Sequence, residues 1–253
     1  MLAPIRLYAI AAFLVVSSQS AAVAACRPES FEGAHYTVCS FDLAATDLRM
    51  FWRDGDSEPY RTFSALQDDL AGKGLTLDFA MNGGMYADDF RPIGLYIEGG
   101  KEITAANTAS VEQKPEPNFY KKPNGVFYMD EDEAGILETG KFLNVRPETQ
   151  FATQSGPMLV IDGDIHPAFI VGSTDRKARN GVGVSSPGEV HLVISEGRVN
   201  FYDFARFFRD RLGCDDALFL DGGTAPGLYA PELDRDDAPG HGGYGPIIAV
   251  VQE

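Results

Sequence analysis

Apolar residues in this chain fall mostly into short runs, which are typical of strands. Residues 34–42 alternate apolar and polar side chains as a half-buried strand does, and residues 47–52 could pair with them across a turn. The runs at 76–81 and 217–220 are more continuously apolar and predict buried strands. Other strands are expected at 94–98, 125–128, 158–161, 181–185 and 247–251, and a hairpin at 189–194 and 198–201.

Two segments have the periodicity of helices. In 203–212 the apolar side chains recur at i, i+3, i+4 and i+8, with Asp203 placed to cap the first turn and Gly213 to end the helix. In 62–71 Ser64 is placed to act as the cap. Many strands, two clear helices and no regular βαβ alternation predict an α+β fold. We expect a single domain with a large mixed or antiparallel β-sheet core and a few flanking helices.

The first 25 residues have the character of a secretory signal peptide. Arg6 precedes an apolar stretch at 7–16, and small residues follow it. The apolar stretch is too short to span a bilayer core of about 30 Å, and nothing later in the chain predicts a transmembrane helix. The sequence therefore predicts an exported protein, periplasmic or extracellular, whose folded domain occupies 26–253.

The cysteines agree with export but leave one question open. Cys26 and Cys39 could form a disulfide in an oxidising compartment. Alternatively, Val23-Ala24-Ala25-Cys26 resembles a bacterial lipobox, which would place a lipid anchor on Cys26. Cys214 is expected to be a small buried apolar group.

The charge balance excludes one class of partner. The formal net charge is −16, and it becomes −17 once the segment containing Arg6 is removed. A general nucleic-acid binder needs a basic surface to neutralise phosphates, so no nucleic-acid partner is expected.

The two buried strands at 76–81 and 217–220 both end in a polar residue followed by two glycines. Asp221 precedes Gly222 and Gly223, and Asn82 precedes Gly83 and Gly84. A carboxyl in a partly dry setting has a shifted pKa and suits acid, base or metal chemistry. The alternative is an aspartate that accepts hydrogen bonds from its own turn.

The loop after residue 81 carries groups that could hold an anion. The Asn82 amide and the backbone N–H groups of Gly83 and Gly84 form a candidate cradle. Tyr86 and Arg91 could supply a phenol and a guanidinium to the same ligand. Taken alone, this segment is also an ordinary turn.

Polar residues at two more strand boundaries each have more than one possible role. Ser155, in Gln154-Ser155-Gly156-Pro157, could donate a hydrogen bond or act as a nucleophile, but the chain lacks a Gly-x-Ser-x-Gly motif. Arg179 precedes an apolar strand and could form an ordinary ion pair or recognise a phosphate. The histidines lack metal-ligand spacing, so the metal stays unknown and no cofactor is certain. A divalent cation held by Asp221 and other oxygens stays open.

Six segments together resemble the phosphodiester glycosidase family, and they occur in order over nearly the whole mature chain. They are Asn82-Gly83-Gly84-Met85-Tyr86, Pro92-Ile93-Gly94-Leu95, Asn118-Phe119-Tyr120 with Pro123-Asn124-Gly125-Val126-Phe127, Gln154-Ser155-Gly156-Pro157, Arg179-Asn180-Gly181-Val182-Gly183 and Leu220-Asp221-Gly222-Gly223. The resemblance implies hydrolysis of a sugar-1-phosphodiester to a free sugar and a phosphomonoester, with a small molecule or glycan as substrate.

The resemblance also assigns roles to residues. Asp221, Asn82 and Arg179 are expected to be catalytic, and Arg179, Arg91 or Lys122 to hold the phosphodiester charge. The residues expected to bind substrate are Gly83, Gly84, Tyr86, Arg91, Asn124, Gln154, Ser155, Gly156, Gly222, Gly223 and Thr224.

Two features depart from a complete glycosidase pattern. Related sequences often have a serine shortly after Asp-Gly-Gly, whereas Ala225 follows Thr224 here, so the role of that serine passes to Thr224 or is absent. Glycosidic hydrolysis usually uses two carboxyl groups. Asp78 is a candidate for the second, although strand alternation could direct it elsewhere.

We expect Asn82, Asn124, Ser155, Arg179 and Asp221 to converge on one cleft. The alternative function is a non-catalytic envelope- or carbohydrate-binding module that uses the same pocket.

Overall fold

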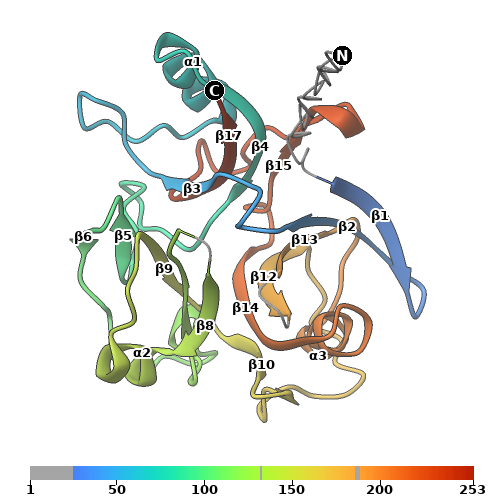
Figure 1. Ribbon diagram of the computed structural model, residues 1–253. Coiled ribbons are helices and arrows are strands. Elements are labelled where there is room, and N and C mark those ends of the chain that lie inside the picture. Colours follow the sequence, from blue (N-terminus) through green and yellow to red (C-terminus); the bar gives the residue numbers. More distant parts are fainter. Residues whose placement is uncertain (1–24, 132, 186–188) are drawn as a thin grey trace, which may run out of the picture.

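Three antiparallel sheets pack around a shared core, and a helix covers the outer face of each sheet (Figure 1). This arrangement comes from a computed structural model that describes residues 25–131, 133–185 and 189–253. Apart from Ala25, the predicted signal segment lies outside the described residues. The α+β prediction is confirmed, and every pairing between neighbouring strands is antiparallel.

The largest sheet has seven strands and carries Asp221. Its strands, in spatial order, are β1 (Ala25–Phe31), β2 (Ala34–Phe41), β13 (Glu189–Ser195), β12 (Arg179–Ser185), β14 (Cys214–Gly222), β10 (Met158–Ile161) and β11 (Asp164–Ile165).

The other two sheets have five strands each. One contains, in order, β16 (Arg235–Asp236), β15 (Leu228–Ala230), β4 (Thr76–Asn82), β17 (Ile247–Gln252) and β3 (Leu48–Phe51). The other contains β6 (Lys101–Thr104), β5 (Tyr96–Glu98), β9 (Phe151–Ser155), β7 (Gly125–Met129) and β8 (Ala134–Glu138).

The helices are short. They are α1 (Phe63–Gly72), α2 (Thr139–Val145) and α3 (Phe201–Arg206), which continues as the π-helical turn η2 (Phe207–Arg211), and the 3₁₀ turns are η1 (Asn118–Tyr120) and η3 (Pro231–Leu233). None of the helices in the described ranges has the length and apolar character needed to cross a bilayer.

Both predicted helix caps are wrong by a few residues. Thr62, not Ser64, caps α1 by accepting a hydrogen bond from Ala65 N–H. Asn200, not Asp203, caps α3, because the Asn200 side chain accepts from the N–H of Asp203. Each cap lies three residues before the amide that it satisfies, so Asp203 is already in the first turn.

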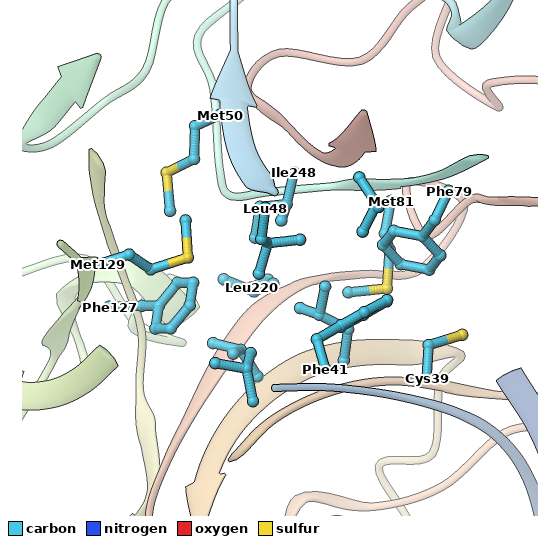
Figure 2. Close-up of a cluster of buried hydrophobic side chains, with 14 of the residues drawn as sticks. Cys39, Phe41, Leu48, Met50, Phe79, Met81, Phe127, Met129, Leu220 and Ile248 are labelled. Atoms are coloured by element: carbon cyan, nitrogen blue, oxygen red, sulfur yellow. The ribbon is translucent and has the colours of Figure 1, made fainter. Parts of the chain in front are cut away.

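The core follows from the alternation of side chains along strands. On β14, Leu218 and Leu220 point into the central cluster, whereas Ala217 and Phe219 join the cluster beneath α3. Figure 2 shows side chains from all three sheets meeting in the central cluster. Period-two alternation thus gives β14 two apolar faces, as its continuous apolar run predicted.

Two predicted strand pairings are wrong. β3 pairs with β17 and not with β2, because β1 and β13 occupy both edges of β2. Residues 198–201 do not form a hairpin with β13, since Val199 makes an isolated bridge to Lys177 and Phe201 begins α3.

The predicted disulfide is present. Cys26 and Cys39 lie opposite each other on β1 and β2 and form a disulfide bond. The Cys26 thiol is therefore not available to a lipid anchor in this structure. Cys214 is buried at the start of β14, as expected.

Candidate functional site

The strand ends that carry polar residues come together where two sheets meet. In the ladder between β12 and β14, Asn180 lies opposite Asp221 and Arg179 lies opposite Gly222. The end of β4 reaches the same place, because the side chain of Asn180 bonds to Asn82. Residues almost 140 positions apart in the sequence thus become neighbours.

Asn180 connects the two strand ends. Its Nδ2 donates to the backbone oxygen and to Oδ1 of Asn82, at 3.0 and 2.8 Å, and its Oδ1 accepts from the N–H of Asp221 at 2.9 Å. Asn180 and Asn82 are fully buried. Such a network fixes the backbone of Asp221 relative to β4.

Asn82 has one donor group without a partner. Its Oδ1 accepts from Asn180 and from Gly227 N–H, the latter at 3.0 Å, so its Nδ2 points elsewhere. Among the described residues this Nδ2 has no hydrogen-bond acceptor, although it is buried. An unsatisfied buried donor is costly and is a common feature of functional sites.

Asp221 is half-buried at the end of β14. One carboxylate oxygen accepts from Gly222 N–H at 2.8 Å, as in a simple turn. Burial nevertheless raises the pKa of Asp221 to about 7, and the hydrogen bond from Gly222 opposes this shift only in part. At neutral pH this carboxyl can both give and take a proton.

Asp221 lies on the wall of a cavity of about 560 Å³. The volume is in the range of small-molecule sites. The described residues that line the cavity are Met85, Tyr86, Ala87, Asp88, Phe90, Ile93, Pro117, Asn118, Phe119, Tyr120, Asp221, Gly222, Ala225 and His241.

Tyr86 forms part of this wall and is held firmly. Its hydroxyl donates to the backbone oxygen of Gly243 at 2.8 Å, and its ring stacks on Phe90. Burial, and to a lesser extent the charge of Asp221, raises the pKa of Tyr86 to about 12. Tyr86 therefore stays neutral and offers an aromatic surface to a ligand.

Thr224 contacts the cavity only indirectly, through His241. Its hydroxyl hydrogen-bonds to the ring of His241, which lines the cavity. A side chain on Gly240 would collide with the backbone of Thr224, so only glycine allows the His241 loop to approach this closely.

Arg179 does not line the cavity. Its guanidinium lies over the ring of Phe201, 3.6 Å from the centroid, and donates to the backbone oxygens of Val199 and Asp175 at 2.9 and 3.4 Å. Burial lowers its pKa to about 10. Arg179 is thus adjacent to Asp221 along the ladder, but its side chain contacts a different set of residues.

Three of the predicted binding residues support the cavity from behind. Ser155 is buried and donates to the backbone oxygen of Leu220 at 2.9 Å. Gln154 bonds to the backbone of Leu95 and Asn107. Asn124 donates to the backbone oxygen of Phe119 at 3.0 Å and so holds a segment that lines the cavity.

Several predicted glycines allow close backbone packing. A Cβ on Gly83, Gly84 or Gly156 would meet Ile248, Thr153 or Asn124, respectively, at less than 3.0 Å. Gly223 has a φ of +76°, which favours glycine at the turn after β14.

Two predicted charged residues are not among the residues that line the cavity. Arg91 is exposed and pairs with Asp89 at 3.6 Å. Asp78 is half-buried on β4 and is not among the residues that line the cavity.

The structure therefore separates the predicted site residues that line the cavity from those that support it. Tyr86, Asp221 and Gly222 line the cavity, and Asn82 lies in the network behind it. Prediction from sequence did not single out Asn180 or His241. Asn180 stands inside a quoted motif beside the more conspicuous Arg179, whereas His241 lies in a glycine-rich loop without a recognisable spacing.

The described residues contain no group of three or more His, Cys, Asp or Glu side chains arranged to hold a metal ion.

Comparison with known proteins assigns the family. The model of the phosphodiester glycosidase family matches residues 76–247, which include Asn82, Asn180 and Asp221. The chain belongs to this family. The resemblance inferred from the six motifs is confirmed.

Individual proteins are similar to this chain at different levels of identity. The uncharacterized protein YigE of Escherichia coli (strain K12) is 39% identical over 175 residues, and the match covers 69% of this chain and 66% of YigE. The catalytic domain of zebrafish N-acetylglucosamine-1-phosphodiester alpha-N-acetylglucosaminidase, auto-inhibited by its pro-peptide, has a TM-score of 0.61 at 15% identity. That match covers 93% of this chain and 85% of the zebrafish chain.

A third relative is a Burkholderia pseudomallei protein whose given name describes it as exported. It has a TM-score of 0.55 at 13% identity, and the match covers 86% of this chain and 74% of the Burkholderia chain. The two solved structures establish a shared fold.

Proposed function

We propose that the cavity around Asp221 hydrolyses a sugar-1-phosphodiester and releases a free sugar and a phosphomonoester. One observation carries this proposal: a carboxyl with a pKa of about 7 lies on the wall of a cavity in a phosphodiester glycosidase domain. The zebrafish relative, whose name describes it as a phosphodiester glucosaminidase, supports the choice of substrate class.

Asp221 can supply the proton transfers of this reaction. In its protonated form it gives a proton to the bridging oxygen of the phosphodiester while the bond between that oxygen and the sugar breaks. Water provides the new hydroxyl group of the sugar, and the proton released by that water returns to Asp221. The carboxyl is thus restored at the end of each turnover.

The surroundings of Asp221 suit a sugar. Tyr86, Phe90 and Tyr120 present aromatic surfaces to the cavity, while Asn118, Asp88 and His241 offer polar groups. Asn180 and Gly222 fix the position of Asp221. These contacts preorganise the carboxyl before the substrate arrives.

The deciding assay compares wild type with Asp221→Asn on a panel of sugar-1-phosphodiesters, with and without a chelator. We expect the variant to lose at least about 100-fold in kcat/KM, the usual minimum contribution of a proton-transfer group. Because protonated Asp221 is the active form, wild-type kcat/KM should fall as the pH rises above about 7. A loss of activity in chelator would show that a divalent cation takes part.

Asp216→Asn is a matched control for this assay. Asp216 lies on the same strand, burial raises its pKa too, and it is not a cavity residue. Equal turnover by wild type and Asp221→Asn would remove Asp221 from the mechanism. No turnover by wild type, together with measurable saccharide binding, would favour the binding-module alternative.

We also propose that the protein is exported with residues 1–25 as its signal peptide. The Cys26–Cys39 disulfide and the exported Burkholderia relative support this location. Mass spectrometry of the mature protein from its host should find Cys26 near the new N-terminus and bonded to Cys39. A diacylglyceryl group on Cys26 would instead support the lipid-anchor alternative.

A further inference from the structure

Two basic side chains meet on one aromatic ring next to the cavity. The Arg179 guanidinium lies 3.6 Å from the centroid of the Phe201 ring, and Lys121 Nζ lies 5.4 Å from the same centroid. Arg179 is 1% exposed and Lys121 is half-buried. The two come from segments almost 60 residues apart, so the fold itself brings the two charges together.

Neither cation has an acidic partner. In the described part of the chain, no carboxylate oxygen lies within 4.0 Å of Lys121 or Arg179. Burial lowers the pKa of Arg179, whereas the charge of Asp175 raises it, and Asp175 itself pairs with Lys177 at 3.3 Å. By contrast, Arg235 contacts both Glu196 and Asp237.

The hydrogen bonds of the pair do not neutralise it. Lys121 Nζ donates to the amide oxygen of Asn118 at 3.4 Å, and Arg179 donates through Nε and one terminal nitrogen to backbone oxygens. The other terminal nitrogen, Nη1, makes no hydrogen bond to a described residue. Burial lowers the pKa of Lys121; the charge of Asp175 opposes this shift in part, and the like charge of Arg179 adds to it. Two neighbouring cations in a poorly solvated place, neither of them in a direct ion pair, favour binding of an anion.

Lys121 and Arg179 both adjoin residues that line the cavity. Asn118, the acceptor for Lys121, lines the cavity together with Tyr120. On the other side, Arg179 pairs in the ladder with Gly222, which also lines the cavity. An anion beside Lys121 would therefore lie next to residues that form the wall of the cavity containing Asp221.

We propose that Lys121 and Arg179 form an anion subsite for the phosphoryl group of the substrate. Lys121 contacts the phosphoryl oxygens directly, because it is the more exposed of the two. Arg179 is buried against the same Phe201 ring and adds its charge to the attraction. The choice of a phosphoryl ligand rests on the proposed function, whereas the presence of an anion subsite rests on the two charges.

Inorganic phosphate tests the subsite without requiring turnover. Calorimetric titration of the full mature protein with phosphate should show binding that Lys121→Met weakens at least tenfold and Lys121→Arg largely retains. Lys177→Met is the matched control, because it removes an equal charge from an exposed lysine nearby and should change binding less than threefold. Thermal unfolding of each variant confirms that it is folded.

Three outcomes would overturn the subsite: no phosphate binding by wild type, equal weakening by Lys121→Met and Lys177→Met, or acetate binding as tightly as phosphate at equal ionic strength. The test is separate from that of the proposed hydrolysis. Asp221→Asn should lose turnover and keep phosphate binding. If wild type binds phosphate through Lys121 yet cleaves no phosphodiester, the hydrolysis fails and the subsite stands.

Discussion

The Asp221 carboxyl carries a cost for the folded state that depends on pH. Its pKa is about 7 in the folded protein, whereas an aspartate in an unfolded chain titrates near 3.9. Between these values the folded protein holds a proton that the unfolded chain has released. Stability therefore falls as the pH rises from about 4 to about 7, and above that range this contribution stays constant.

Asp221→Asn should remove this dependence while keeping the hydrogen bond from Gly222. We expect the difference in stability between variant and wild type to grow in favour of the variant by on the order of 2 kcal/mol between pH 5 and pH 8. Urea unfolding at the two pH values measures it. Other titrating groups are common to both proteins and cancel. An identical pH dependence in both proteins would show that Asp221 is ionised in the fold.

Asn180 is the residue that should matter most without lining the cavity. Replacing it with alanine leaves the N–H of Asp221 and both oxygens of Asn82 without this partner, which should cost about 1–3 kcal/mol of stability. Because Asp221 then loses its fixed position, we expect kcat to fall at least about tenfold with a smaller change in KM. Steady-state kinetics on the folded variant measures both constants.

A variant of similar instability separates positioning from simple loss of stability. Thr37→Val removes the part-buried hydrogen bond that Thr37, on β2, donates to Glu196, and β2 is not adjacent to β14 in the sheet. It should lose stability and keep kcat. A comparable fall of kcat in both variants would contradict a positioning role for Asn180.

At the scale of elements, the start of α3 gives a direct contrast between two candidate caps. Asn200 is fully buried, accepts from Asp203 N–H at 2.8 Å and donates to the backbone oxygen of Ser173 at 3.1 Å. Asp203 makes a partly exposed ion pair with Arg176.

Asn200→Ala should therefore destabilise the protein by about 1–2 kcal/mol, the usual value of a helix cap. Asp203→Ala should cost less than about 1 kcal/mol, since exposed ion pairs contribute little. Urea unfolding of the two variants ranks them. A larger loss for Asp203→Ala would mean that the ion pair, and not the cap, holds the start of the helix.

At the scale of the whole molecule, one cluster joins all three sheets, so they should unfold together. The central cluster includes Trp52 from the segment after β3, Phe127 from β7 and Leu220 from β14. Trp52 is the single tryptophan of the chain and so reports on this cluster.

We expect unfolding followed by Trp52 fluorescence and by far-ultraviolet circular dichroism to give the same midpoint and slope in urea. Conditions that keep the disulfide intact apply to both measurements. Separate midpoints would show that a sheet unfolds independently of the shared core.

Local patterns were enough to predict most elements and the α+β class. Alternation located β2 and the apolar run located β14, because side chains on a strand must match the two faces that they cover. The pairing of strands was harder to predict from the sequence. Residues 47–52 are predicted to pair with β2, but β3 pairs with β17, which is about 200 residues away in the sequence. Which edges are free depends on the whole sheet and not on a local turn.

The order of the motifs and the residue types at the strand ends were enough to indicate the family and the chemistry of the site, since both are properties of the amino-acid sequence. Asp221 could be predicted as a site residue because an acidic residue that follows a buried apolar run lies at the end of a strand. Which side chains reach the cavity depends on how the sheets pack together. The tertiary structure placed Arg179 on Phe201 beside Lys121, Ser155 on a backbone oxygen and Asn180 between two strand ends. These contacts join residues far apart in sequence, and their direction follows from sheet register and side-chain packing.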